Sequence, residues 1–283
     1  MTEKYTDAQY QSEDGLRLHY RDYTTVPELP AILCMPGLTR NCRDFAPIAR
    51  HVTTRYRVLC PDLRGRGKSD YDPNWQHYHP LTYVADMWRL LDHLGIQRCR
   101  LIGTSLGGVM GMIMAASQPE RIVGLVLNDI GPEVGPEGIA RIVAYAGLQP
   151  PAANWQDAAR KAREIHGANL PGLEMRRWLA FAHATCKETE NGIVPDMDPN
   201  IGTALREAGN ATADMWEIFQ HIHTPTLVLR GALSDILLPR TVETMRKIHP
   251  RLQALTIPDR GHAPLLDEPT ALRAIDHFLE ITP

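Results

Sequence analysis

A Gly-x-Ser-x-Gly pattern at residues 103–107 is the stretch of this chain best suited to chemistry. A serine hydroxyl attacks a carbonyl group only when it is exposed and a base can take its proton. An apolar, β-rich run (99–102) precedes the pattern, and a small-residue helical pattern (109–116) follows it. A tight strand-to-helix turn, for which Gly103 and Gly107 leave room, lifts a serine above the sheet edge. The sequence therefore predicts that Ser105 is a nucleophile at a helix N-terminus, where free N–H groups favour developing negative charge.

A serine nucleophile needs a histidine as general base and a carboxylate that fixes the tautomer of that histidine. Among the twelve histidines, His262 follows a predicted C-terminal strand and stands between small residues that leave its ring free to move. Asp235 lies just past the end of another strand, so it should reach the same rim of the sheet. The order Ser105, Asp235, His262 is the one expected for this type of turn. Asp129, which follows the preceding core strand, is the alternative carboxylate, and the sequence favours Asp235.

Two N–H donors must also stabilise the oxyanion that forms when the carbonyl is attacked. One is the backbone N–H of Leu106, directly after the serine. The other should come from the loop after the apolar run 31–35, where Gly37 lets the chain pass close to a substrate. The sequence predicts the N–H of Leu38 as this second donor. The competing interpretation is that Pro36 and Gly37 form only a turn.

Three further patterns resemble ligand sites, but their context favours structural roles. The basic loop Arg64–Lys68 lacks the length and the following helix of a phosphate-binding Walker motif, so we expect it to support the oxyanion region. Asp196 and Asp198 stand between prolines ahead of a helical run, which favours helix capping over calcium binding. Two histidine pairs at i,i+2 spacing have no carboxylate at the spacing of a zinc site. We therefore expect no metal and no cofactor.

These groups must be held at one edge of a sheet. Apolar strand-like runs alternate with helical patterns over residues 31–128 and again over 225–279, which predicts an α/β fold with a mostly parallel sheet covered on both faces. Residues 9–23 alternate around a turn signal and predict two antiparallel edge strands. Residues 132–213 contain helical stretches and no strand pattern, which predicts an inserted helical cap. The predicted division is core 1–131, cap 132–213 and core 214–283.

Length and composition narrow the class of protein. A chain of 283 residues suits one α/β domain with an inserted subdomain. Its net charge of -3 and pI of about 6.5, with both signs interspersed, give no indication of nucleic-acid or membrane partners. We see no apolar signal core at the N-terminus and no run long enough to span a bilayer. Five cysteines without a metal spacing indicate reduced thiols. We expect a cytoplasmic protein, and a homodimer remains open.

The motifs described above, in their order along the chain, resemble those of the α/β-hydrolase superfamily. The matching stretches are Pro36-Gly37-Leu38, Pro61-Asp62-x-Arg64-Gly65-x-Gly67-x-Ser69, Gly103-x-Ser105-x-Gly107, Gly231-x-x-Ser234-Asp235 and Gly261-His262. The resemblance implies a predominantly parallel eight-stranded sheet, a Ser–His–Asp triad and a cap that shapes the substrate pocket. Dehalogenases and epoxide hydrolases of this fold use an aspartate where Ser105 stands. Carbon–carbon bond hydrolases typically carry Asn and Trp where this chain has Thr104 and Ala263, which counts against that subgroup.

We therefore expect a serine hydrolase that cleaves a small-molecule carboxylic ester or lactone through an acyl-enzyme, as enol-lactonases and carboxylesterases do. An acyltransferase or a carbon–carbon bond hydrolase would use the same triad. A ligand-binding protein that kept the fold without turnover is a third interpretation. Four aromatic residues of the predicted cap and its exit either line the pocket or form the cap core. These residues are Trp155, Trp178, Phe181 and Trp216.

Overall fold

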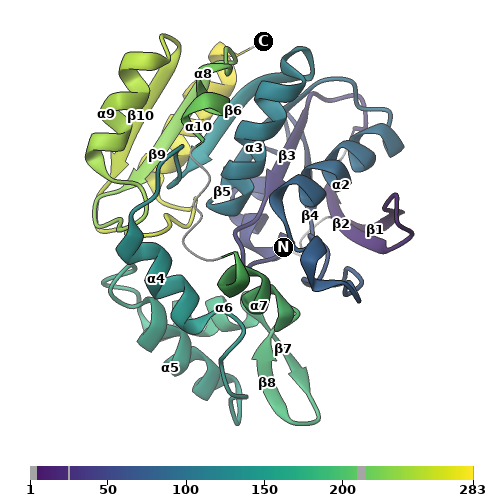
Figure 1. Cartoon of the computed structure of the whole chain (residues 1–283), viewed down its shortest axis with the longest axis vertical. Coiled ribbons are helices and arrows are strands. Elements are labelled where there is room, and N and C mark those ends of the chain that lie inside the picture. The colour runs from purple at the N-terminus through teal and green to yellow at the C-terminus, as the bar shows by residue number, and fades with distance from the viewer. Residues whose placement is uncertain (1–4, 25, 209–214, 283) are drawn as a thin grey trace.

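The computed structural model describes residues 5–24, 26–208 and 215–282. An eight-stranded sheet in the order β1-β2-β4-β3-β5-β6-β9-β10 forms its centre (Figure 1). The strands of this sheet are β1 (Thr6–Gln11), β2 (Arg17–Tyr23), β3 (Ala31–Met35), β4 (Arg57–Pro61), β5 (Cys99–Thr104), β6 (Ile122–Asn128), β9 (Thr226–Gly231) and β10 (Leu252–Ile257). Two further strands, β7 (Cys186–Thr189) and β8 (Gly192–Pro195), pair only with each other. Strands β1, β2 and β4 pair antiparallel, and the pairs from β4 to β10 are parallel. The predicted α/β fold is thus confirmed.

Helices cover both faces of the sheet because its central strands are apolar on both sides. The helices are α1 (Ala46–Val52), α2 (Pro80–His93), α3 (Leu106–Ser117), α4 (Pro136–Tyr145), α5 (Trp155–His166), α6 (Met175–Thr185), α7 (Asn200–Glu207), α8 (Trp216–Gln220), α9 (Pro239–Ile248) and α10 (Pro269–Ile281), with 3-10 turns η1 (Cys42–Phe45), η2 (Trp75–His77) and η3 (Pro119–Arg121). Every residue of β3 and of β6 is buried. One core cluster packs α2, α3, α8 and α9 against the sheet, and a second packs α1 and α10.

The segment between β6 and β9 contains α4 to α7 and the two-stranded hairpin β7–β8, and we call residues 136–207 the insertion. It packs across one end of the sheet (Figure 1). The sequence predicted only helices here, so the hairpin is a correction. Glu190 and Asn191 form the turn, and Gly192, with a φ of +113°, begins β8. The Asn-Gly pair at residues 191–192, a common hairpin signal, is the pattern that was missed. The predicted boundary at residue 213 lies outside the described residues.

The insertion has its own small core around Trp178, Ala182 and Ile193. Ala152 pairs with Ile193 of β8 through backbone hydrogen bonds in both directions, each 2.8 Å, which ties the hairpin to the chain before α5. This packing makes the insertion a defined wall over the ends of the strands.

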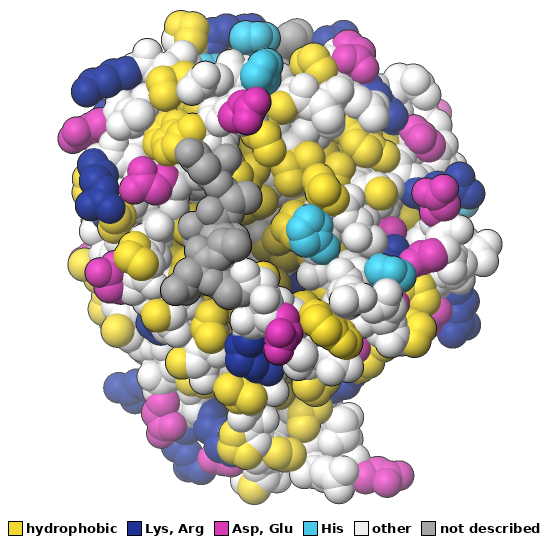
Figure 2. All heavy atoms as spheres, viewed as in Figure 1, with side chains coloured by type: hydrophobic (Ala, Val, Ile, Leu, Met, Phe, Trp, Pro, Cys, Tyr) yellow, Lys and Arg dark blue, Asp and Glu magenta, His cyan; other side chains and the backbone are white. Residues whose placement is uncertain are grey.

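The exposed surface carries charges of both signs. On the face drawn in Figure 2, Lys and Arg side chains alternate with Asp and Glu side chains, and hydrophobic side chains gather over its upper centre. Among the described residues, no helix combines the length and the apolarity needed to cross a bilayer.

Candidate active site

The predicted strand–turn–helix motif is present at Ser105. Strand β5 ends at Thr104, Ser105 has a φ of +52°, and α3 begins at the next residue. A Cβ atom on Gly103 would lie 2.3 Å from the carbonyl oxygen of Gly107, and one on Gly107 would lie 2.0 Å from that of Met35. Both glycines are therefore required by close backbone approach. The left-handed conformation of a non-glycine residue is strained and typical of functional turns.

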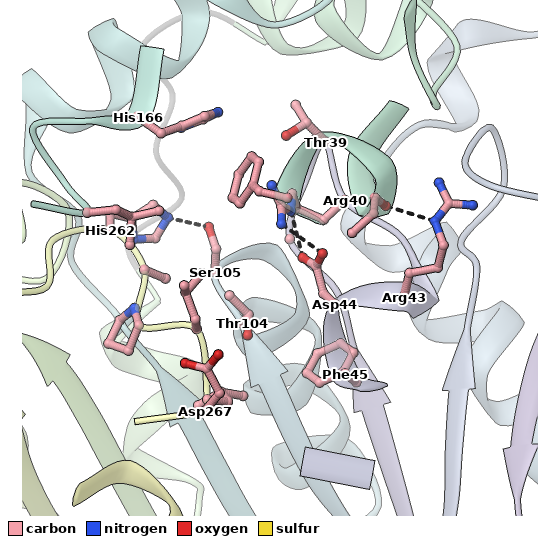
Figure 3. A pocket seen from close by; sticks show the side chains of 18 of the residues that line it. Thr39, Arg40, Arg43, Asp44, Phe45, Thr104, Ser105, His166, His262 and Asp267 are labelled. Carbon is pink, nitrogen blue, oxygen red and sulfur yellow. Dashed lines mark hydrogen bonds and ion pairs between the residues drawn. The ribbon is translucent and has the colours of Figure 1, made fainter. Parts of the chain in front are cut away.

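A chain of hydrogen bonds connects Ser105 to a histidine and a buried carboxylate. The distance from Ser105 Oγ to His262 Nε2 is 2.9 Å, and the distance from His262 Nδ1 to Asp129 Oδ2 is 2.8 Å (Figure 3 shows the first contact). When Nδ1–H donates to the carboxylate, Nε2 keeps its lone pair and accepts the serine proton. Loops far apart in the sequence, after β5, β6 and β10, thus meet at one edge of the sheet.

The prediction that Asp235 is the carboxylate partner of His262 is wrong. Asp235 accepts hydrogen bonds from Arg141 Nε and Nη2 of α4, at 2.7 and 2.8 Å. Burial would raise the pKa of Asp235, but the hydrogen bond and charge of Arg141 hold it below its ordinary value. Asp129, the alternative, follows β6 directly and has a φ of +56°, which directs its side chain at the histidine.

Asp129 is held on both of its oxygens. It is fully buried, and Oδ1 accepts from the Gly231 N–H at 2.7 Å. Oδ2 accepts from Ser234 Oγ at 2.6 Å and is the atom that contacts His262. Three donors therefore satisfy the buried carboxylate, which would otherwise be costly to remove from water.

The loop after β3 runs beside the serine, as expected for a second oxyanion donor. A Cβ atom on Gly37 would lie 3.7 Å from Ser105 Cβ, and Leu38 lines the same cavity. Leu106 is the first residue of α3, a position whose N–H has no acceptor within the helix. Leu106 thus follows Ser105 directly in the chain, and Leu38 follows a glycine that lies beside the serine in space.

The basic loop Arg64–Lys68 contacts the loop that carries Leu38, as the sequence predicted. Arg66 is fully buried, and its Nε donates to the carbonyl oxygen of Leu38 at 3.0 Å. Arg64 is buried against three carboxylates that the sequence did not indicate. Its partners are Asp14, Asp72 and Asp86, at 2.6 to 2.7 Å. The two arginines of the loop are therefore bound to groups of the protein itself, which accounts for the structural role of the loop.

A cavity of about 340 Å³ opens above Ser105, between the strand ends and the insertion. Of the four aromatic residues left open by the sequence, Phe181 lines this cavity. Trp178 is buried in the core of the insertion, and Trp155 stacks on His183 at 3.9 Å between ring centroids. Trp216 packs against the main core instead.

Residues 30–269 match the family model described as alpha/beta hydrolase fold. The chain belongs to this family. It is 31% identical over 271 residues to a 3-hydroxybutyrate-oligomer hydrolase of Cupriavidus necator, covering 93% of this chain and 92% of the relative. It is 29% identical to the mouse sn-1-specific diacylglycerol lipase ABHD11, with 89% and 81% covered. A solved α/β hydrolase from Novosphingobium aromaticivorans is 43% identical, with a TM-score of 0.93 and 99% of both chains covered.

Sequence reasoning missed one residue that holds the histidine loop of this α/β hydrolase. Asn169, which follows α5 in the insertion, accepts from the Gly261 N–H with its backbone oxygen at 2.6 Å. Its Oδ1 accepts from the His262 N–H at 3.1 Å. A Cβ atom on Gly261 would lie 2.2 Å from that oxygen, so the contact depends on the glycine. No local pattern marks Asn169, because its partner lies about ninety residues away.

A second missed residue, His166 at the end of α5, lines the cavity of the α/β hydrolase (Figure 3). Burial lowers the pKa of His166 to about 3, with further lowering from the positive charges of Arg40 and Arg141. At neutral pH this imidazole is therefore uncharged.

Two groups of side chains among the described residues have the composition of a metal site, but neither lines the cavity of Ser105. In the first, His19 Nδ1 contacts Asp62 at 2.7 Å, so it already has a protein partner. The second group is Asp14, Asp72 and His77, where Arg64 pairs with both carboxylates. Helix capping was predicted for both Asp196 and Asp198. Asp198 accepts from the N–H of Asn200, the first residue of α7, at 2.9 Å, whereas Asp196 pairs with Arg43 at 2.6 Å and caps no helix among the described residues.

Proposed function

We propose that this α/β hydrolase is a serine hydrolase that cleaves a carboxylic ester or lactone of a small molecule through an acyl-enzyme. The observation that carries the proposal is the unbroken hydrogen-bond chain Ser105–His262–Asp129, with contacts of 2.9 and 2.8 Å. This is the arrangement of nucleophile, base and orienting carboxylate that acyl transfer requires.

In the first half of the reaction, Ser105 Oγ bonds to the substrate carbonyl carbon while its proton moves to His262 Nε2. The N–H groups of Leu38 and Leu106 stabilise the negative charge on the former carbonyl oxygen. Asp129 stabilises the imidazolium that forms. The bond to the alcohol oxygen then breaks, and His262 gives the proton to that oxygen.

In the second half, water attacks the acyl carbon and His262 takes one of its protons. The acyl–serine bond breaks, and the proton returns to Ser105 Oγ. The net reaction converts an ester and water into an acid and an alcohol, without change of oxidation state. The reaction therefore needs no electron donor or acceptor.

The relatives support ester chemistry. One is named a 3-hydroxybutyrate-oligomer hydrolase and another a diacylglycerol lipase, and acylglycerols are carboxylic esters. The cavity supports a small substrate, since about 340 Å³ lies within the size range of small-ligand sites.

The test is hydrolysis of a panel of p-nitrophenyl esters and simple lactones by the wild type and by Ser105→Ala. We expect turnover by the wild type and a loss of kcat of about 10⁶-fold in the variant. Ser117→Ala, an exposed serine at the far end of the same helix, is the matched control and should keep full activity. Equal activity in the wild type and Ser105→Ala would contradict the proposal.

A further inference from the structure

Arg40 lies beside the nucleophile on the loop that carries the oxyanion donor Leu38. A Cβ atom on Gly37 would lie 3.5 Å from Arg40 Cγ and 3.7 Å from Ser105 Cβ. The stem of Arg40 and the serine therefore flank the same glycine. Arg40 also lines the cavity, and Figure 3 shows it beside the space above Ser105.

The guanidinium group of Arg40 is fixed in place by two neighbours. Its Nε and Nη2 donate to the two oxygens of Asp44, at 2.6 and 2.8 Å. Its Cζ lies 4.1 Å from the ring centroid of Phe181, a cation–π contact. The side chain is 18% exposed, so it is held with little freedom at the wall of the cavity.

One edge of this guanidinium remains available. Asp44 uses Nε and one N–H of Nη2, whereas Nη1 has no hydrogen-bond partner in the part of the chain that the structure describes. Nη1 and the second N–H of Nη2 form a fork whose geometry matches a planar carboxylate. Because the group is already oriented, binding a carboxylate there costs little side-chain entropy.

Arginines gather on the wall of the cavity around Arg40. Four arginines line it, Arg40, Arg43, Arg50 and Arg177, against two aspartates, Asp44 and Asp267. Arg43 has a further carboxylate partner, Asp196, which lies outside the lining at 2.6 Å. Most of the other lining residues are apolar, so a charge placed there is weakly screened.

The positions of His262 and Arg40 relative to Ser105 indicate which part of the substrate lies near Arg40. His262 lies on one side of the serine and Arg40 on the other (Figure 3). Because His262 protonates the leaving alcohol, that part of the ester lies toward the histidine. The acyl group then extends in the opposite direction, toward Arg40.

We propose that Arg40 binds a carboxylate carried by the acyl group of the substrate, so that the enzyme prefers half-esters of short dicarboxylic acids over neutral esters. The proposal rests on the proposed function, because it names the substrate class of the same site. Arg40 acts here as a specificity-determining residue that contacts the substrate.

The experiment compares kcat/KM for the mono-4-nitrophenyl esters of succinate, glutarate and adipate with their methyl-capped forms. Each pair differs only in the charge of the acyl terminus, and the three lengths sample the distance to Arg40. We expect the wild type to prefer the charged form of at least one length.

The decisive variants are Asp44→Asn and the double variant Arg40→Met/Asp44→Asn, which differ only at Arg40. Asp44→Asn removes the competing charge, while the amide oxygen and the Phe181 ring still hold Arg40, so it should keep or raise the charged-to-neutral ratio. The double variant should lower that ratio by at least about 10-fold, mainly through KM, since a charge-assisted hydrogen bond is lost. Equal ratios in the two variants would overturn the proposal.

A second pair of substrates tests the side assignment. The butyrate ester of 4-hydroxybenzoate, with a carboxylate on the alcohol side, is compared with that of methyl 4-hydroxybenzoate. We expect this ratio to be independent of Arg40. Dependence on Arg40 with this pair alone would show that the acyl-side assignment is wrong.

Failure of this inference is distinguishable from failure of the proposed function. Neutral esters cleaved in a Ser105-dependent manner, without any effect of Arg40 on charge preference, would leave only the proposed function standing. Calorimetric binding of glutarate to Ser105→Ala tests the subsite even where no ester turns over. We expect Arg40→Met/Asp44→Asn in that background to bind glutarate at least about 10-fold more weakly than Asp44→Asn does. Equal binding by both would overturn the proposal.

Discussion

Two aspartates follow neighbouring parallel strands, and only one of them contacts the histidine. Asp129 comes after β6 and Asp235 after β9, strands that are hydrogen-bonded to each other. Asp129 is fully buried and holds His262 Nδ1 at 2.8 Å. The side chain of Asp235 is 31% exposed and pairs with Arg141 of the insertion. The carboxylates at two adjacent strand ends thus have different partners, an imidazole in one case and an arginine of the insertion in the other.

The difference shows what holds a carboxylate in position against the imidazole of His262. Asp129 has donors on both oxygens, from Gly231 N–H and Ser234 Oγ, so it presents one fixed oxygen to the imidazole. A fixed, dehydrated charge stabilises the imidazolium without rearrangement during the reaction. Asp235 instead forms an ion pair with Arg141 and is partly exposed to solvent. Its contact joins the insertion to the sheet.

The largest expected effect separates the two aspartates directly. Asp129→Asn should lower kcat for an ester substrate by about 10⁴-fold, because an amide no longer holds His262 in the tautomer that accepts the serine proton. Asp235→Asn should lower it by less than about 10-fold. Both values are measured with the ester that the wild type hydrolyses best, after circular dichroism has shown that each variant is folded. The opposite ranking would return the catalytic role to Asp235.

A smaller effect should follow from removing one donor to Asp129. Ser234 Oγ donates to Asp129 at 2.6 Å and accepts from the N–H groups of Ile236 and Leu237, at 3.2 and 3.0 Å. Ser234→Ala leaves the carboxylate with one donor fewer and frees it to move. We expect a loss of kcat of about 10- to 100-fold and a loss of unfolding free energy of about 1 to 3 kcal/mol.

Ser69→Ala is the matched control for that change. Ser69 is equally buried, donates to the Asp62 carbonyl oxygen at 2.6 Å and accepts from the His19 N–H at 2.8 Å, away from the cavity. It should lose similar stability by urea unfolding but keep its kcat. If both variants lose kcat in proportion to stability, Ser234 has no specific role in holding Asp129.

The same pair of aspartates shows which features of the site can be predicted from the sequence. The motif at Ser105 and the position of His262 after the last strand were readable, because local turn chemistry and strand order fix both. Those signals place carboxylates at an edge of the sheet. They do not give the direction in which each carboxylate points. That direction depends here on the φ of Asp129 and on the hydrogen bond from Arg141 to Asp235. Asn169 was beyond reach for a related reason, since a contact between distant loops leaves no local pattern.

The smallest expected effect concerns the Asp235–Arg141 ion pair and its dependence on pH. The folded-state pKa of Asp235 is lowered from 3.8, so the stability it contributes is present above that value and is lost as pH falls through the folded pKa. The side chains are 31% and 26% exposed, and a partly solvated pair of this kind contributes less than about 1 kcal/mol. Asp235→Asn should therefore lower Tm by at most about 2 °C at pH 7, and by progressively less as the pH falls below 3.8.

Arg141→Gln should reproduce that loss, and combining the two substitutions should add little, because each alone already breaks the contact. Differential scanning calorimetry at pH 7 and pH 3, with low and high salt, provides the comparison, and salt should reduce the difference at pH 7. A Tm difference that persists unchanged at pH 3 would mean that Asp235 acts through packing, not charge. The two strand ends would then differ in burial alone, and the electrostatic contrast between Asp129 and Asp235 would have to be abandoned.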